Sequence, residues 1–208
     1  MFPSLTRDEV FRIETPRLWL RWPRLEDAAG LAQWSGRPEV AGATSTVPVG
    51  ITTAEMAAKI ADMRAINAAG AGLCFAIVRQ GADGYPIGML GGQAKPGKRF
   101  EIGYHLNPEH WGQGRMTEAV QALCAQAFEL ASIDAIEAGV RPSNIASMRV
   151  LEKCGFDASG VADHESPLYG RYPIVTYALA RSRPSALKAA AQRRYRAATT
   201  ATRELGLV

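Results

Sequence analysis

The sequence lacks the features that mark membrane, secreted and metal-binding proteins. No apolar run in its 208 residues approaches the ~20 residues that span a bilayer, and the first ten residues carry charges instead of the apolar core of a signal peptide. The three cysteines, Cys74, Cys124 and Cys154, form no CxxC pair, so we expect buried thiols in a reducing compartment rather than a disulfide framework. Three histidines occur without the spacing of metal ligands. These absences predict a cytoplasmic protein with no bound metal.

Charge is unevenly distributed along the chain. The sequence has 24 Lys and Arg against 20 Asp and Glu, and its net charge is +4. Residues 181–208 hold seven of these basic residues and a single acid, Glu204, so residues 1–180 are slightly acidic. The high pI therefore belongs to the tail and does not indicate a nucleic-acid-binding body. The tail has a weak helical stripe and could be a solvated helix, an arm that packs on this chain or a second copy, or an RNA-binding element.

Hydrophobic periodicity divides the rest of the chain into strands and helices. The strands are expected at Ile13–Trp22, Leu73–Arg79, Pro86–Gly92, Phe100–Leu106, Ala135–Val140 and Ile174–Ala180. The helices are expected near 24–32, from Thr52 or Thr53 to Asn67, at Gly114–Ala131 and at Asn144–Lys153, and residues 35–50 are expected to be a loop. Consecutive strands mixed with strand–helix–strand crossovers favour an α/β sandwich around one mixed sheet.

One segment combines a strand, a glycine-containing turn and the start of the clearest helix. It reads FEIGYHLNPEHWGQGRMTE over residues 100–118. Gly112 and Gly114 allow backbone conformations closed to other residues, and the N–H groups that follow, up to about Thr117, would point outward at a helix N-terminus. Such a terminus suits a phosphate or another anion. The GxGxxG and GxxxxGK[ST] patterns are missing, so a nicotinamide cofactor or a nucleoside triphosphate is not supported. An ordinary strand–helix turn is the alternative interpretation.

Three segments follow one another in an order typical of a known enzyme family. They read ETPRLWLRWPRLEDA (Glu14–Ala28), WGQGRMTEA (Trp111–Ala119) and RPSNIASMRVLEKCGF (Arg141–Phe156). Together they resemble the GNAT N-acetyltransferases, most closely the RimJ/RimL-like branch that contains the ribosomal-protein N-terminal acetyltransferases. The resemblance covers about residues 11–180. It implies a three-layer α/β (α+β) fold in which helices flank a mixed, mostly antiparallel central sheet. It also implies an acyl-CoA-dependent N-acetyltransferase domain at 1–180, with a basic extension at 181–208.

The same resemblance implies a site for acetyl-CoA as co-substrate. The loop backbone would hold the CoA pyrophosphate through Gly112, Gln113, Gly114, Arg115, Met116 and Thr117. Asn144 would contact the pantetheine arm or a water near it. Many family members use a Tyr shortly after this Asn as general acid, but residues 145–156 contain none. Ser147, or a water, would then donate to the departing CoA sulfur.

A base for the acceptor amine is expected on the strand before the loop. A lysine amine, with a pKa near 10.4, is almost fully protonated at pH 7, whereas a free α-amine is partly neutral. Strongly basic acceptors therefore need more help from a base. Glu101 is the first candidate and His105 the second, although each could instead be a structural strand residue. Strand alternation places both on one face together with Gly103. The opposite face carries Ile102, Tyr104 and Leu106.

The expected activity is transfer of acetyl from acetyl-CoA to a primary amine by direct attack on the thioester. The acceptor would be a protein N-terminal α-amine or a small-molecule amine, bound by loops such as 35–50 and 163–173. The alternative function is a GNAT-fold acyl-CoA-binding regulatory module with little or no turnover. A homodimer is a further option and a membrane partner is not expected. Contact with nucleic acid or a ribosome would involve only the basic tail.

Overall fold

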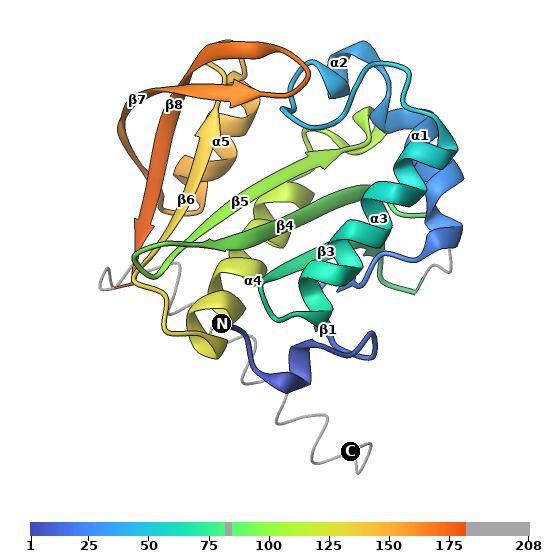
Figure 1. The fold of residues 1–208 in the computed structure, drawn as a ribbon, viewed down its shortest axis with the longest axis horizontal. Coiled ribbons are helices and arrows are strands. Elements are labelled where there is room, and N and C mark those ends of the chain that lie inside the picture. The colour runs from blue at the N-terminus through green and yellow to red at the C-terminus, as the bar shows by residue number, and fades with distance from the viewer. Residues whose placement is uncertain (82–84, 182–208) are drawn as a thin grey trace.

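The computed structural model describes residues 1–81 and 85–181 (Figure 1). Among these residues, eight strands form one sheet with the order β1-β2-β3-β4-β5-β6-β8-β7. Neighbouring strands are antiparallel except β5 and β6, which run parallel. The mixed, mostly antiparallel sheet flanked by helices is therefore confirmed. The helical tail expected from the sequence lies outside the described residues.

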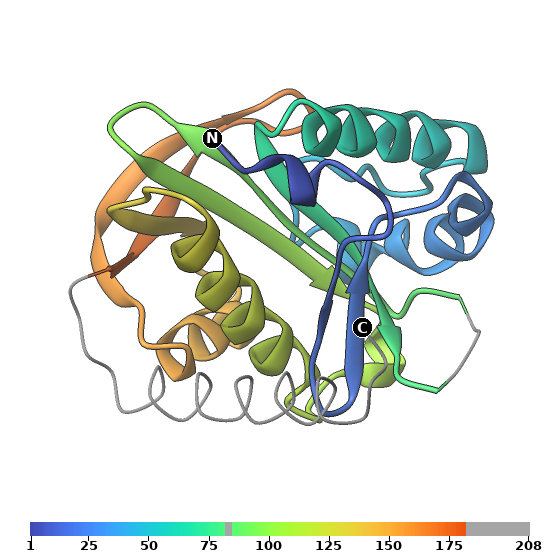
Figure 2. The ribbon, with the colours of Figure 1, turned by 90° about the horizontal axis from the view of Figure 1, so that it is seen from below.

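Helices cover both faces of this sheet, and Figure 2 shows the three layers. The strands are β1 (Arg12–Glu14), β2 (Leu18–Arg21), β3 (Gly72–Arg79), β4 (Gly88–Lys95), β5 (Arg99–Leu106), β6 (Ala135–Val140), β7 (Asp157–Ser166) and β8 (Gly170–Ala180). The α-helices are α1 (Ala28–Ser35), α2 (Pro38–Ala41), α3 (Thr53–Ala68), α4 (Arg115–Leu130) and α5 (Ile145–Lys153). Helices α4 and α5 pack on one face, and α1 and α3 pack on the other. No helix in the described part of the chain has the length and apolar content needed to cross a membrane.

Each face of the sheet has its own hydrophobic core. The larger core includes the predicted stripe of α4, in which Met116, Val120, Leu123 and Ala127 are all buried. The smaller core lies under α1 and α3 and includes Met56 of α3. Side chains of β5 alternate across the sheet, so Tyr104 packs against the larger core, while His105 on the other face contacts α1. The sheet thus separates two chemical environments, one on each side of β5.

The first predicted strand is in fact a hairpin. Residues 13–22 are interrupted at Pro16, and the Thr15 N–H donates to the Leu18 carbonyl to close a turn. Strands β1 and β2 then pair antiparallel. The proline favours this break because it has no N–H to donate to a ladder.

Two further segments differ from the sequence prediction. The predicted loop at 35–50 contains the short helix α2, which begins at Pro38, a residue favoured in the first helical turn. The sequence pattern does not predict β7, because nearly all of its side chains are exposed and no alternation marks it. Its partner β8 starts at Gly170 instead of Ile174, and together they form the hairpin that ends the sheet.

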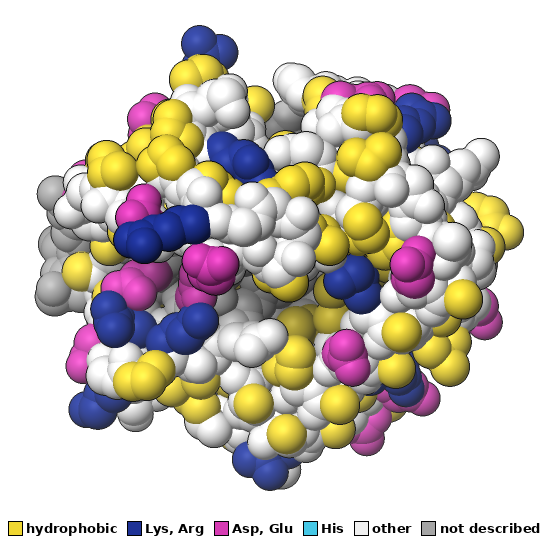
Figure 3. Space-filling model, turned by 45° about the horizontal axis from the view of Figure 1, so that its top comes forward, with side chains coloured by type: hydrophobic (Ala, Val, Ile, Leu, Met, Phe, Trp, Pro, Cys, Tyr) yellow, Lys and Arg dark blue, Asp and Glu magenta, His cyan; other side chains and the backbone are white. Residues whose placement is uncertain are grey.

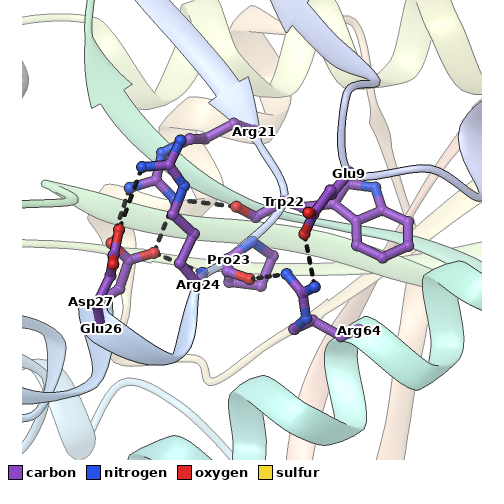
Figure 4. A network of polar contacts seen from close by, with 8 residues as sticks. All are labelled: Glu9, Arg21, Trp22, Pro23, Arg24, Glu26, Asp27 and Arg64. Carbon is purple, nitrogen blue, oxygen red and sulfur yellow. Dashed lines mark hydrogen bonds and ion pairs between the residues drawn. The ribbon is translucent and has the colours of Figure 1, made fainter.

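A buried ion pair joins β2 to the start of α1 (Figure 4). Two guanidinium nitrogens of Arg21 lie 2.8 Å from the two carboxylate oxygens of Asp27. The backbone N–H of Arg24 donates to the same carboxylate at 2.8 Å. Beside the pair, Arg64 of α3 donates to the Pro23 carbonyl at 3.0 Å. These contacts fix α1 and α3 relative to the sheet edge.

Replacing Asp27 with Asn should strongly destabilise the protein. Its side chain is only 4% exposed, so the substitution leaves Arg21 buried without its counter-charge. We expect a loss of about 3–5 kcal/mol in the free energy of unfolding, measured in urea. Glu26→Gln is the control, because that side chain is 72% exposed in its pair with Arg24, and its loss should stay below about 1 kcal/mol. An equal loss of unfolding free energy in the two variants would contradict a stabilising role for the buried pair of Arg21 and Asp27.

Candidate functional site

The parallel strands β5 and β6 pair only where they begin. Their register joins Arg99 to Ala135, Phe100 to Ile136 and Glu101 to Glu137, and no further. Beyond these pairs β5 stays bonded to β4, and β6 stays bonded to β8, so the two strands diverge (Figure 1). Within residues 1–81 and 85–181, the facing edges of the diverging ends have no strand partner. Because backbone N–H and C=O groups need partners when they are covered, these edges are suited to an extended ligand.

Glycine lines the opening on the β5 side. A Cβ added at Gly103 would meet no atom within 4 Å, so this position borders open space. Gly103 pairs with Gly91 of β4 in a register without a bulge. On the β6 side, a Cβ at Gly139 would lie 2.5 Å from Cδ1 of Ile174, so that glycine is required for packing. Only the first of these glycines leaves room for a ligand.

The loop before α4 has the backbone geometry that the sequence predicts. Gly112 and Gly114 have φ angles of +71° and +73°, in the left-handed region that favours glycine. A Cβ at Gly112 would meet nothing within 4 Å. Helix α4 begins at Arg115, and its N-cap, Gly114, provides no side-chain cap. The first N–H groups of this 16-residue helix are therefore available to an anion, which the helix dipole also favours.

Side chains brace this loop from outside. Arg17, in the β1–β2 turn, donates to the Gln113 carbonyl at 3.1 Å and pairs with Glu118 at 2.6 Å. Arg115 contacts the Gln113 side chain and lies 3.1 Å from Nδ1 of His110. The loop is thus tied both to the N-terminal hairpin and to the first turn of its own helix.

The last two predicted loop residues can contribute only in part. Met116 is buried in the core, so it offers its backbone and not its side chain. The Thr117 carbonyl accepts from the Cys154 thiol, whose sulfur lies 3.6 Å away. Burial raises the pKa of Cys154 to about 12. This cysteine is therefore an unreactive thiol next to the loop.

Tyr104 forms a contact with Ser147 that sequence reasoning missed. The Tyr104 hydroxyl lies 2.9 Å from Oγ of Ser147 and donates to the Ser147 carbonyl at 3.2 Å. Burial raises the pKa of Tyr104, although the hydrogen bond with Ser147 opposes this shift. Asn144 caps α5, because its Oδ1 accepts from the Ser147 N–H at 3.0 Å. Strand alternation assigned Tyr104 to the face opposite Glu101, but only the fold places α5 against that face.

The predicted base Glu101 lies where β5 and β6 part. Its Oε2 is 2.6 Å from Nζ of Lys95, and both side chains are roughly half-exposed. Its register partner on β6, Glu137, pairs with Arg99 at 3.2 Å. Two carboxylates with similar ion pairs therefore flank the closed end of the opening.

His105 lies on the same face as Glu101, as predicted, but contacts α1. Its Nε2 is 3.1 Å from Oγ of the buried Ser35, and its ring centroid is 5.4 Å from that of Trp34. Burial lowers the pKa of His105 to about 4, and the positive charge of Lys59 adds to this shift. The imidazole is therefore neutral at pH 7 and is a weak base.

The two loops expected to build the acceptor pocket contact each other. Ser166 at the end of β7 donates to the Ser45 carbonyl at 2.8 Å. The Tyr169 hydroxyl donates to the Ala41 carbonyl at 3.4 Å. The β7–β8 turn therefore lies against α2 and the segment that follows it, as Figure 1 shows.

This site can be compared with known proteins. A family model described as an acetyltransferase (GNAT) domain matches residues 17–157, well over half of the chain. The chain belongs to the GNAT acetyltransferase family. The uncharacterized N-acetyltransferase p20 of Bacillus licheniformis is 33% identical to this acetyltransferase over 160 residues, which cover 76% of this chain and 88% of that protein. The probable N-acetyltransferase YjcK of Bacillus subtilis (strain 168) is 52% identical over 61 residues, only 34% of its length and 29% of this chain.

Solved structures share the fold of this acetyltransferase. Mycobacterium smegmatis RimJ in complex with CoA-disulfide matches with a TM-score of 0.73 and 23% identity, covering 90% of this chain and 94% of that one. A GNAT-family acetyltransferase from Bacillus anthracis matches with a TM-score of 0.71 and 21% identity, covering 83% of this chain and 100% of that one. At these identities the likeness concerns the fold. The predicted family, fold and enzyme class of this chain are confirmed.

The neutral state of His105 makes the acetyltransferase sensitive to acid. Its pKa of about 4 in the folded state lies below the ordinary 6.5, so the unfolded chain binds more protons between these values. The corresponding stability is complete above pH 6.5 and is lost as the pH falls toward 4. His105→Asn should remove on the order of 3 kcal/mol of this acid-dependent loss, seen as a flatter dependence of Tm on pH. His164→Asn, on the β7–β8 hairpin, is the control. If Tm depends on pH with the same slope in the wild type and in His105→Asn, then His105 is not the source of the acid sensitivity.

Proposed function

We propose that this acetyltransferase moves acetyl from acetyl-CoA to a primary amine by direct attack of the amine on the thioester. The observation that carries the proposal is the divergence of β5 and β6 beside a glycine loop that opens α4. The loop turns back onto β5, because Nε1 of Trp111 donates to the Leu106 carbonyl at 2.7 Å. The phosphate site and the opening therefore lie at the same end of the sheet. Two structural neighbours, Mycobacterium smegmatis RimJ and the microcin C7 self-immunity acetyltransferase MccE, are complexes with CoA-disulfide and with acetyl-CoA and AMP, respectively.

Acetyl-CoA fits the residues that surround this opening. The backbone N–H groups of 112–117 would bind the pyrophosphate, and the absence of a side chain at Gly112 leaves room for it. Asn144 and Ser147, at the start of α5, would flank the pantetheine arm, and Gly103 would face it from β5. This arrangement supports one continuous binding path from the loop to the point where the strands part.

Acetyl-CoA supplies a reactive acetyl thioester, and the side chains of this chain would handle the protons. The amine attacks only in its neutral form, and Glu101 would accept its proton directly or through a water. The contact of Lys95 with Oε2 leaves Oε1 for this task. Ser147 would pass its hydroxyl proton to the departing CoA sulfur and take up a proton from water at the same time, so that its hydroxyl is restored. Tyr104 would orient that hydroxyl and, because its pKa is raised, remain a neutral hydrogen-bond donor itself.

The acceptor is proposed to be the α-amine of a protein or the amine of a small molecule. Structural neighbours include RimL, a ribosomal L7/L12 alpha-N-protein acetyltransferase, and the microcin C7 self-immunity acetyltransferase MccE. The contacts between the β7–β8 turn and the segment after α2 support a bounded acceptor pocket on the face opposite α4 and α5. A regulatory module without turnover would bind acetyl-CoA equally well, so binding and transfer need separate tests.

The loop assignment is tested by a matched pair of glycine variants. Gly112 and Gly81 have φ angles of +71° and +73°, and a Cβ at either would meet nothing within 4 Å. Gly112→Ala and Gly81→Ala should therefore lose similar stability, about 1 kcal/mol each. In the wild type and in Gly81→Ala, acetyl-CoA at 100 times its Kd should add about 2.7 kcal/mol and raise Tm by several degrees. Gly112→Ala should lose most of this shift. A full shift in Gly112→Ala would contradict the loop assignment, and no shift in the wild type would contradict the function.

The role of Ser147 is tested by its removal. Ser147→Ala should lower kcat about 100-fold, because the departing sulfur loses its proton donor, while the stabilisation by acetyl-CoA persists. Steady-state release of the CoA thiol measures the rate. Ser143→Ala is the control, because this serine is exposed in the turn before α5 and should leave kcat unchanged. An unaltered kcat in Ser147→Ala would assign the proton to water.

A further inference from the structure

Arg141 follows the last residue of β6, and its guanidinium lies between two tyrosine rings. Its central carbon is 3.8 Å from the ring centroid of Tyr172 and 4.7 Å from that of Tyr169. One of its terminal nitrogens, Nη2, is buried and has no hydrogen-bond partner in residues 1–81 and 85–181. A buried donor of a charged group without an acceptor is costly. The residue as a whole is partly exposed, so a ligand can still approach its positive charge.

The position of Arg141 places it on the acceptor side of the sheet. Ile136, Ala138 and Val140 alternate into the core under α4 and α5, so Arg141 lies on the opposite face, which β5 shares through Glu101 and His105. Figure 3 shows the side of the molecule that carries the β7–β8 turn and α2. It is hollowed near the middle, with Lys, Arg, Asp and Glu side chains gathered along one side of the hollow. The arginine thus stands at the open end of the diverging strands, on the face that also carries Glu101 and His105.

The chemistry of this arginine favours a carboxylate. A guanidinium presents a planar fork of donors that matches the two oxygens of a carboxylate, and its positive charge attracts an anion even where one nitrogen of the fork is buried. Among residues 1–81 and 85–181, no carboxylate forms an ion pair with Arg141. Asp163 of β7 binds Arg171 at 2.6 Å, and Glu137 of β6 binds Arg99 at 3.2 Å. The counter-charge for Arg141 must therefore come from outside these pairs.

We propose that Arg141 binds a carboxylate of the acceptor and so selects amines that carry an acid group close to the amine. This inference rests on the proposed acetyl transfer. The carboxylate could belong to a free amino acid, or to an acidic side chain next to the α-amine of a protein. In both cases Arg141 positions the acceptor, and the two tyrosines hold the guanidinium flat against the β7–β8 hairpin.

The test compares amines that differ only in this acid group. One set offers free amino acids and their carboxamides, and a second set offers N-terminal peptides with Asp or Glu at position two and their Asn or Gln counterparts. Release of the CoA thiol gives kcat/KM for each pair. In at least one pair, we expect kcat/KM for the acid to exceed kcat/KM for the amide by about tenfold or more. The set in which this occurs identifies the source of the carboxylate.

Three variants assign the preference to Arg141. Arg141→Gln should abolish this preference, because the amide is uncharged and cannot attract the carboxylate. Arg141→Lys should retain part of the preference for acids, since lysine keeps the positive charge but lacks the planar fork of donors. Arg171→Gln, which removes an exposed arginine of the same hairpin, should keep all of it.

The failures of this inference and of the proposed function are distinguishable. Three outcomes would overturn the role of Arg141. The first is an equal kcat/KM for acids and amides, and the second is a preference for acids that survives in Arg141→Gln. The third is a large fall in the Tm of Arg141→Gln together with an equal loss of kcat/KM for acids and amides. Stabilisation by acetyl-CoA without acetylation of any acid would also overturn it and leave cofactor binding intact. A wild type that acetyl-CoA does not stabilise would overturn the proposed function itself.

Discussion

The short parallel ladder between β5 and β6 is the constraint on which the rest of the structure depends. Three pairs hold the two strands together, and each strand then follows its other neighbour. A sheet that stayed paired would bury the edges of both strands and leave no entry between them. Because the ladder ends at Glu101 and Glu137, backbone donors and acceptors face an opening instead of each other. The glycine loop, the cap of α5 and the arginine after β6 are all placed by this separation.

The helical layers convert the opening into two unlike faces. On one side, α5 brings the hydroxyl of Ser147 against the phenol of Tyr104 on β5, and burial raises the pKa of that phenol so that it stays a neutral donor. On the other side, α1 brings Ser35 against a histidine that burial keeps uncharged, while ion pairs line the point where the strands part. Helix α1 keeps its position because the buried pair of Arg21 and Asp27 anchors its first turn. A ligand that crosses the sheet at this opening would thus meet proton donors on one face and charged groups on the other.

Local signals in the sequence were sufficient for the elements that bury one face. The stripe of α4 predicted its buried side chains. Of the two threonines at which α3 was expected to begin, the structure selects Thr52, which caps the helix in a reciprocal exchange with Glu55. The glycines of the loop predicted its left-handed turns. Strand β7 gave no such signal, because it pairs through its backbone while its side chains face solvent. The contacts of Ser147 with Tyr104, and of Arg141 with Tyr172, join residues about 30 to 40 positions apart that periodicity cannot relate.

The clamp that Arg17 forms on the glycine loop also bears on the order of folding. Its bonds to Gln113 and Glu118 span about a hundred residues of chain. Helix α4 can form from local contacts, whereas the clamp requires the N-terminal hairpin to have joined the sheet through β3. Closing so long a segment is entropically unfavourable until the intervening strands have assembled. We therefore expect the loop to reach its braced form among the last steps of folding, after the core that supports it.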